Sequence, residues 1–378
     1  MTAANDTDSL TEPRDQLWEA LGDGDETRAV AIVRRALATA DPRQPNAVDR
    51  PPAEQLSAVG ERILLELIAP AQERVGMAWA ANDLTVAQEH VATAISERCI
   101  AAIVDATAPA LTGSFVGRVL VACVDGEWHA LPARLVSEVL RLRGWRVDYL
   151  GAQVPTEHLV VHADRTRAQA VLLSSSIPTH LPDAHNAIIS CQGAGIRVLA
   201  GGAAFGPQGR HARLMQAEWA RDAPGAATLL ARNPTRPGAR TARLPDVDLP
   251  HLADQEYTMV RRSKRQLVKQ TLADVATGFP DMGRYNEYQL ERTVEDIEYI
   301  VSYLATALYV DDPDLFARFI TWAADILAAR DVPPRCLLPA LNSLLSQLKD
   351  FPRVVGILTA ARNRLVYPPP AQPTASPG

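Results

Sequence analysis

The fold is decided by residues 117–151, which read GRVLVACVDGEWHALPARLVSEVLRLRGWRVDYLG. A short apolar run comes first, an amphipathic stretch follows and closes at Gly144, and a second apolar run starts at Trp145. Glycine is expected at this place, just past the end of a helix. The alternation continues through the runs QAVLLSSSI and IRVLAGG. This rhythm is typical of βαβ units, so the sequence predicts an α/β domain with a parallel sheet over residues 113–232.

Helical patterns flank this domain on both sides. Apolar residues recur at steps of three and four in residues 14–112 and again in 252–368, as in amphipathic helices. The Pro- and Arg-rich segment 233–251 is expected to be a linker, and the low-complexity tail 369–378 is expected to be disordered. At roughly 150 residues per domain, a chain of 378 residues holds two to three domains.

Composition narrows the class of protein. Apolar residues make up 47% of the chain and charged residues 22%, which is typical of a globular protein. With 38 basic and 44 acidic residues the net charge is −6, so nucleic acid is not the expected partner. No apolar run approaches the length of a membrane span, and the amino-terminal residues are polar, so no membrane partner or secretory signal is expected. Four widely spaced cysteines without a CxxC pair favour a reduced, cytoplasmic setting over disulfides or a zinc site.

The first candidate cluster lies in the amino-terminal helical block. Thr85, with Gln88 three residues later, forms a capping-box pattern and predicts that a helix begins there. Glu89 and His90 then fall in its first turns, while Trp79 lies at the end of the preceding helix. The turn between the two helices would bring an indole ring and a Glu–His pair to one rim.

The second candidate cluster is the loop VDGEWHALP, which follows the first predicted strand. In a doubly wound sheet, ligands bind at the loops beyond the carboxyl ends of the strands. His129 has an acid, Glu127, two residues before it. A histidine of this kind can ligate a metal through one ring nitrogen while the other donates to the carboxylate, which fixes the tautomer.

These two clusters resemble the signatures of B12-dependent photoreceptors. Trp79, nine residues and then Glu89-His90 match the Wx9EH signature of the helical cap in that family. Glu127-x-His129 is similar to the family's E/DxHxxG loop.

Two further elements carry the same resemblance, which spans about residues 14–230. Ser174-Ser175-Ser176 and Gly201-Gly202 follow predicted strands where the family has its serine and double-glycine elements. Two positions depart from the pattern: Pro132 stands where the loop motif has glycine, and Ser176 stands where the serine motif has leucine.

The resemblance implies a four-helix-bundle cap on a Rossmann-like, flavodoxin-like cobalamin-binding domain. It makes His129 the lower axial ligand of cobalt, in place of the cofactor's own dimethylbenzimidazole. Trp79 would stack above the corrin and shield an adenosyl group, which Glu89 and His90 would contact. Some relatives have a histidine directly after this tryptophan; here the residue is Ala80, so His90 is the nearest candidate for the upper cobalt position. The channel for the nucleotide tail would be lined by the strand-end residues Ser174, Ser176, Gly201 and Gly202.

The carboxy-terminal block is similar to globin-like sensor and phycobilisome-related helical domains. No histidine follows His251, so a haem held by a proximal histidine is excluded. A B12 module followed by such a domain resembles the photocobilins, which bind B12 and biliverdin. A bilin needs a carboxylate for its pyrrole N–H groups and arginine for its propionates. The candidate bilin contacts are Arg261, Arg262, Arg292, Asp296, Tyr299 and Tyr303, the last four at spacings that share one helix face.

The thiol of Cys336 has two interpretations: covalent attachment of a bilin, or a buried structural cysteine. No role is assigned to the remaining histidines considered, which are His158, His162, His180, His185 and His211.

The sequence thus predicts a light sensor, not an enzyme, that binds adenosylcobalamin and biliverdin. Photolysis would shift the cap, and the signal would pass through a homodimer or a separate signalling partner, because neither a catalytic effector nor a DNA-binding helix-turn-helix is recognised. Two alternatives stay open. One is a corrinoid methyl carrier serving a methyltransferase, and the other is a B12 module whose carboxy-terminal block only dimerises.

Overall fold

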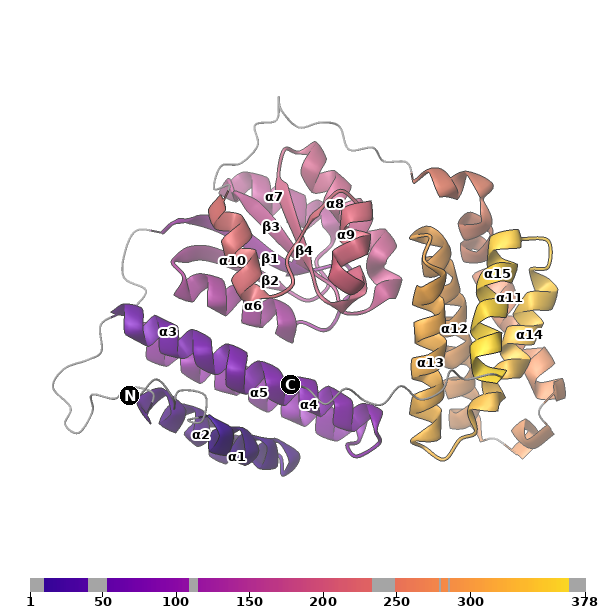
Figure 1. Cartoon of the computed structure of the whole chain (residues 1–378), viewed down its shortest axis with the longest axis horizontal. Helices are drawn as coiled ribbons and strands as arrows, with labels where there is room; N and C mark the ends of the chain where they lie inside the picture. The colour runs from indigo at the N-terminus through magenta and orange to yellow at the C-terminus, as the bar shows by residue number, and fades with distance from the viewer. Residues whose placement is uncertain are drawn as a thin grey trace, which may run out of the picture. The chain divides into compact units, whose positions relative to one another are not determined.

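The computed structural model describes residues 10–39, 53–108, 115–232, 249–278, 280–284 and 286–366. The chain divides into two compact units, Met1–Pro245 and Asp246–Gly378. The first contains a helical bundle and a sheet domain, and the second is helical (Figure 1). Within the described ranges, every helix is too short or too polar to cross a bilayer.

The bundle of the first unit confirms the predicted helical block. Its helices are α1 (Thr11–Gly22), α2 (Glu26–Thr39), α3 (Ala53–Ile63), α4 (Ala69–Ala80) and α5 (Val86–Thr107). The π turn η1 (Leu64–Ile68) joins α3 to α4 without leaving helical backbone geometry. The predicted capping box is present at the start of α5, where Thr85 and Gln88 each accept a hydrogen bond from the other's backbone N–H.

The sheet domain confirms the α/β prediction. Five parallel strands lie in the order β2-β1-β3-β4-β5, which is the flavodoxin-like order. The strands are β1 (Gly117–Cys123), β2 (Trp145–Gly151), β3 (Ala170–Ser174), β4 (Arg197–Gly201) and β5 (Glu218–Trp219). The helices between and after them are α6 (Leu131–Leu142), α7 (Thr156–Thr166), α8 (Leu181–Gly193), α9 (Arg210–Leu214) and α10 (Ala223–Arg232). Gly144 follows α6 with a φ of +84°, as predicted for a residue that closes a helix.

The strand order fixes where a ligand can bind in this domain. It reverses at β1 and β3, and in such sheets the ligand crevice lies beyond the carboxyl ends of those strands. The register pairs Cys123 with Ser174, and Ser174 with Gly201. The loops that carry His129, the serine run and the glycine pair therefore leave the sheet side by side.

Helix α6 joins the bundle to the sheet domain. It lies between the sheet and the bundle helices α3 and α5 (Figure 1). Leu131, Leu135 and Val139 of α6 belong to the hydrophobic core of the bundle. The helix that begins directly after His129 is thus part of the bundle's own packing.

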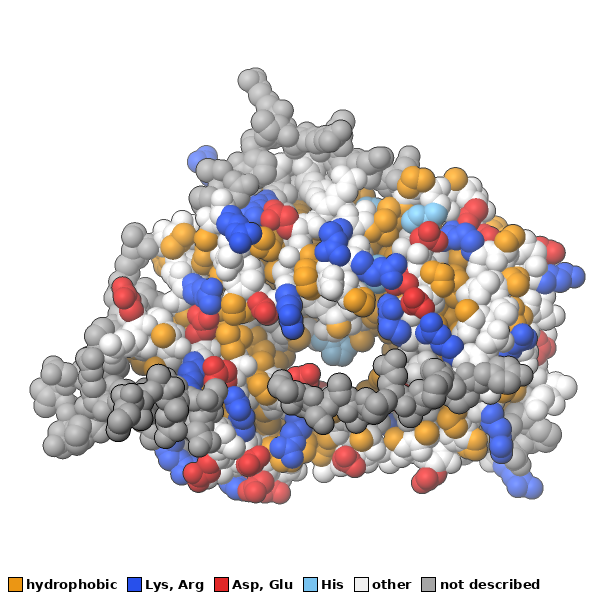
Figure 2. All heavy atoms as spheres, in the orientation of Figure 1, with side chains coloured by type: hydrophobic (Ala, Val, Ile, Leu, Met, Phe, Trp, Pro, Cys, Tyr) orange, Lys and Arg blue, Asp and Glu red, His pale blue; other side chains and the backbone are white. Residues whose placement is uncertain are grey.

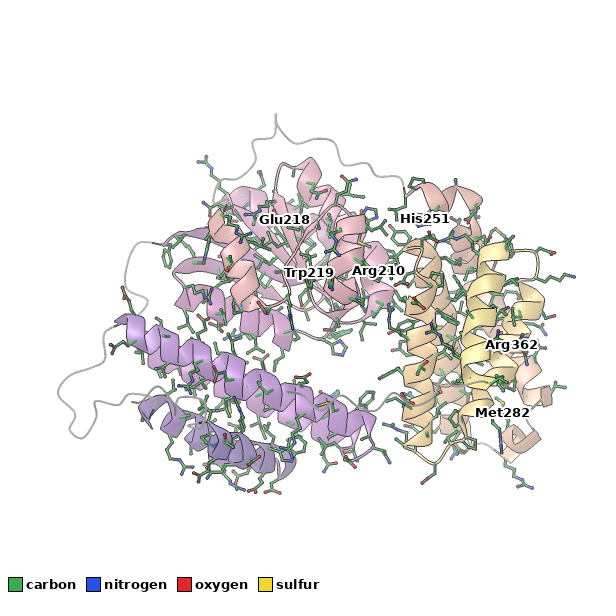
Figure 3. All side chains as sticks on the ribbon, viewed as in Figure 1. Arg210, Glu218, Trp219, His251, Met282 and Arg362 are labelled. Atoms are coloured by element: carbon green, nitrogen blue, oxygen red, sulfur yellow. The ribbon has the colours of Figure 1, made fainter. Side chains whose placement is uncertain are left out.

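The end of the sheet domain is closed by a tight glycine turn. Gly209 precedes Arg210, and both that arginine and Trp219 of β5 are marked in Figure 3. A Cβ on Gly209 would lie 2.1 Å from the ring of Trp219, and its φ is +70°, so only glycine fits there.

The second unit confirms the predicted helical block and leaves its globin-like character a prediction. Its elements are η6 (Pro250–Asp254), α11 (Glu256–Gly278), η7 (Pro280–Arg284), α12 (Glu287–Tyr309), α13 (Pro313–Ala328), η8 (Pro334–Leu337), α14 (Leu338–Gln347) and α15 (Pro352–Val366). His251 lies at the opposite end of the bundle from Met282 (Figure 3), and its Nε2 is 2.8 Å from the carbonyl oxygen of Tyr309. Of the predicted linker, residues 249–251 are described and 233–248 lie outside the described residues, as does the predicted tail 369–378.

Candidate functional site

Glu127 is the buried residue around which the candidate site is built. It is 0% exposed, and its Oε1 accepts a hydrogen bond from the backbone N–H of His129 at 2.9 Å. Oε2 accepts from the backbone N–H groups of Ser176 (2.7 Å) and Ile177 (3.0 Å) and from the hydroxyl of Ser175 (3.2 Å). Burial alone would raise the pKa of Glu127, but the hydrogen bonds outweigh it and lower the pKa to about 2. The carboxylate is therefore charged at neutral pH and ties the loop after β1 to the loop after β3.

His129 is oriented by this carboxylate. Its Nδ1 lies 2.6 Å from Glu127 Oε1, so Nδ1 is assigned as the donor to the charged oxygen. The side chain is 58% exposed. The hydrogen bond to Glu127 raises the pKa of His129. In the neutral ring this arrangement leaves the Nε2 lone pair for a metal, which is the arrangement predicted from the sequence.

The serine and glycine elements meet at the same edge of the sheet, as predicted. The N–H of Ser175 donates to the carbonyl of Gly201 at 3.1 Å. Gly202 has a φ of +102°, and a Cβ there would lie 2.3 Å from the carbonyl oxygen of Ser175. Glycine is required at that position because both the backbone conformation and the close approach forbid a side chain.

Sequence reasoning assigned the serine run only in part. Ser174 lies half-buried at the end of β3. Ser176 contacts Glu127 through its backbone N–H, which donates to Oε2. The buried Ser175, which was given no role, supplies the hydroxyl that reaches Glu127. The alternation of side chains along the run was the available signal, but it does not say which face meets the carboxylate.

The cap residues Trp79, Glu89 and His90 lie at one end of the bundle, as predicted. Trp79 is half-buried on α4, next to its end, and the side chain of His90 is 74% exposed. Glu89 Oε2 lies 2.5 Å from His90 Nδ1, and Oε1 accepts from the hydroxyl of Thr93 at 2.9 Å. The same hydroxyl oxygen lies 3.1 Å from Gln72 Oε1 of α4, so its one hydrogen is shared between the two acceptors, and a polar network not foreseen from the sequence positions the Glu–His pair.

The cap end faces the loop that carries His129. The charge of Glu89 contributes to the raised pKa of His129, which places the two groups within electrostatic reach. Figure 2 shows an open space between the bundle and the sheet domain, with a histidine side chain on the sheet side. Among the described residues, no three metal-ligating side chains gather into a metal site.

Five of the six candidate bilin residues of the second unit lie on exposed helix surfaces. Arg261 and Arg262 are exposed on α11. On α12, Asp296 is exposed and Tyr299 is 54% exposed, while Arg292 pairs with Glu295 at 2.8 Å.

Tyr303, the last of these candidates, is half-buried and stacks on Phe319 of α13, with ring centroids 3.8 Å apart. Burial raises the pKa of the Cys336 thiol, which opposes thiolate formation and favours the structural interpretation of that cysteine.

Comparison with known proteins bears on the first unit. Residues 13–103 and residues 117–229 match two family models, each described as a B12 binding domain. Over 91 residues the chain is 35% identical to the HTH-type transcriptional repressor CarA of Myxococcus xanthus. That match covers 24% of this chain and 31% of CarA, so the chain spans under a third of that relative's length.

Solved structures are similar at low identity. The Methanosarcina barkeri monomethylamine corrinoid protein is 19% identical with a TM-score of 0.45, over 59% of this chain and 99% of that one. A cobalamin-binding protein from Desulfitobacterium hafniense DCB-2 is 18% identical with a TM-score of 0.32, over 57% and 96%. On the matches to the two family models, the helical bundle and the sheet domain are B12-binding domains, and the chain binds a cobalamin-type cofactor.

Proposed function

We propose that this chain is a light sensor that binds adenosylcobalamin with its own base displaced and His129 as the lower cobalt ligand. The observation that carries the proposal is the Glu127–His129 pair, in which a buried carboxylate 2.6 Å from Nδ1 leaves Nε2 for the metal. The charged end of the cap, with Glu89, lies within electrostatic reach of that ring. An imidazole below and a cap rim above are what a corrinoid with one protein ligand requires.

The residues of the sheet loops and of the cap would contact two parts of this cofactor, its nucleotide tail and the upper face of its corrin ring. The close approach of Gly202 to the backbone of Ser175 holds the glycine pair against the serine loop, and the nucleotide tail would lie beside Ser174 and Gly201. Trp79, Glu89 and His90 would cover the upper face. The adenosyl form supplies a cobalt–carbon bond that light breaks. Loss of the covered group would remove contacts that hold Trp79, and the cap would then shift on α6, as in a two-state switch.

The experiment compares protein loaded with adenosylcobalamin before and after anaerobic illumination with green light. A light sensor should show a lasting change in its absorption spectrum and a change in cap position, measured as altered proteolysis of α1–α5. Protein whose spectrum is stable to light but which accepts a methyl group from a methyl donor would instead be a corrinoid methyl carrier. Transmission of the signal through a homodimer or a separate cytoplasmic partner, without enzymatic activity of the chain itself, is part of the proposal.

We propose biliverdin as a second pigment, in the second unit. The support is a groove of about 650 Å³ between α13 and α15, lined by Arg318, Thr321, Trp322, Ala324, Asp325, Pro334, Arg364 and Leu365. Arg318 and Arg364 would pair with propionates, Asp325 would accept from pyrrole N–H groups, and Trp322 would contact a ring. This groove replaces the outward face of α12 as the place where the pigment would bind.

The absorption spectrum of protein supplied with biliverdin tests the second pigment. A red band that weakens in R318Q/R364Q but persists in the matched surface variant R261Q/R292Q would support the groove. Absence of any red band in the unaltered protein would favour a block that only dimerises.

A further inference from the structure

Trp128 is solvent-exposed and directly precedes His129, the candidate cobalt ligand. Its residue is 74% exposed, more than any other large hydrophobic residue in the described part of the chain. The loop around it is nevertheless fixed, because Glu127 is buried and the N–H of Ala130 donates to the carbonyl of Trp128 at 2.8 Å. A large apolar ring held by a rigid loop beside a candidate ligand site offers a surface that a bound ligand would cover.

His180 lies against the same loop from the β3 side. It ends η3 (Pro178–His180), and a Cβ on Gly126 would lie 3.1 Å from both Cε1 and Nδ1 of its ring. The side chain is half-buried, yet within the described residues the ring has no hydrogen-bond partner. The two ring nitrogens are therefore available to hydrogen-bond with a ligand at the edge of the site.

One carboxylate holds both loops in place before any ligand arrives. Glu127 accepts hydrogen bonds from His129 in the first loop and from Ser176 and Ile177 in the second. Because Trp128 and His180 belong to these two loops, their positions relative to His129 are set by the same buried group. Groups held in place in advance bind a ligand at a lower entropic cost.

We propose that Trp128 and His180 form a rim around His129 that grips the periphery of cobalamin. The corrin periphery carries methyl groups, which suit the indole, and amide side chains, which suit an imidazole hydrogen bond. One ligand on His129 would therefore satisfy both residues. The inference rests on cobalamin binding at His129, and it assigns roles to two residues that the sequence motifs leave without one: Trp128, the variable position of Glu127-x-His129, and His180.

The test is the dissociation constant for adenosylcobalamin in the dark, measured by spectral titration of W128A and H180A. Each variant should bind about tenfold more weakly, and W128F should recover most of the loss because it keeps a ring at this position. The matched controls are F115A, which removes a ring that is 55% exposed, and H158A, which removes an imidazole that is 74% exposed. Both controls should bind like the unaltered protein.

The outcomes separate this inference from the function on which it rests. Unaltered protein that fails to retain cobalamin would refute the proposed function. If the unaltered protein binds cobalamin, and W128A and H180A bind it with the same affinity and unfold at the same thermal midpoint as the unaltered protein, the rim alone would be refuted. A change of oligomeric mass in W128A without a change of affinity would also overturn it, because the indole would then contact another protein.

Discussion

At position 127, one buried carboxylate accepts hydrogen bonds from the ring and the backbone of His129 and from three groups of the serine loop. The charge on these oxygens is what lets them accept so many hydrogen bonds, since a neutral amide offers a single acceptor oxygen. The residue therefore has two tasks: it orients the imidazole of His129, the proposed cobalt ligand, and it joins two loops of the sheet.

Glu127→Gln tests both tasks, because it keeps the size of the side chain but removes the charge and one of the two acceptor oxygens. We expect cobalamin affinity to fall about 10- to 100-fold, as for other lost partners of metal-binding histidines. We also expect the free energy of unfolding to fall by about 1–3 kcal/mol, because buried N–H groups lose their acceptor. Spectral titration and urea unfolding measure the two effects. Glu157→Gln, at a side chain 84% exposed, is the control, and equal behaviour of both variants would contradict the account.

Residue identities in the site could be predicted where a short motif carries them. Trp79, Glu89, His90 and the pair Glu127 and His129 stand out in the sequence, and the structure brings them to one side of the first unit. Ser175 and Gln72 could not be predicted, because their roles depend on tertiary contacts between segments far apart in the chain.

At the scale of elements, α6 carries the link between the cap and the sheet domain. It starts directly after the His129 loop, and its apolar face is buried in the core of the bundle. Motion of the cap would therefore act on the helix whose first turn directly follows His129, the proposed cobalt ligand.

Leu135→Ala should weaken this contact. Leu135 is 9% exposed, and its truncation should cost about 2–3 kcal/mol in the free energy of unfolding, measured with urea. Val161→Ala, on the exposed side of α7, should stay within about 0.5 kcal/mol. Equal effects of the two would show that α6 does not anchor the bundle.

Glu97 of α5 adds a pH dependence to the same contact. Its pKa is raised, first by burial and then by the nearby charge of Glu138, while Arg134 acts in the opposite direction. A carboxyl whose folded pKa is raised stabilises the fold below its ordinary pKa of 4.5, and this contribution is lost as pH rises through the folded pKa. Glu97→Gln should therefore gain stability relative to the unaltered protein between pH 4 and pH 7 in urea unfolding. If the stability advantage of Glu97→Gln over the unaltered protein became smaller as pH rises, the predicted direction of the effect would be contradicted.

Element boundaries were predictable where capping chemistry marks them. The capping box at Thr85 and Gly144 after α6 both mark real helix ends. The π turn between α3 and α4 has no such signal. The spacing on α12 did predict a shared face for Arg292 and Tyr299, but it did not show that the face points to solvent, because periodicity alone does not tell which side packs.

At the scale of the whole molecule, cofactor binding belongs to the first unit and a second helical unit follows it. Changes in composition predict three domains, and the structure adds that the first two, the bundle and the sheet domain, pack into one compact unit because α6 contributes to both cores. Composition cannot reveal a shared core.

Cobalamin should therefore stabilise one unit only. In calorimetry, cobalamin at 100 times its dissociation constant should stabilise the first unit by about 2.7 kcal/mol. The thermal unfolding transition of the second unit should stay at the same temperature. His129→Ala at the same cofactor concentration is the control. An equal shift of both transitions would contradict a site confined to the first unit.

The lower cobalt ligand can be identified by electron paramagnetic resonance of the reduced cobalt(II) cofactor bound to protein that carries ¹⁵N-labelled histidine. Coordination by His129 predicts that each cobalt line splits into a doublet, because ¹⁵N has spin one-half, and that His129→Ala lacks the doublet. A triplet from the unlabelled base of the cofactor, or lines without nitrogen splitting, would contradict the account.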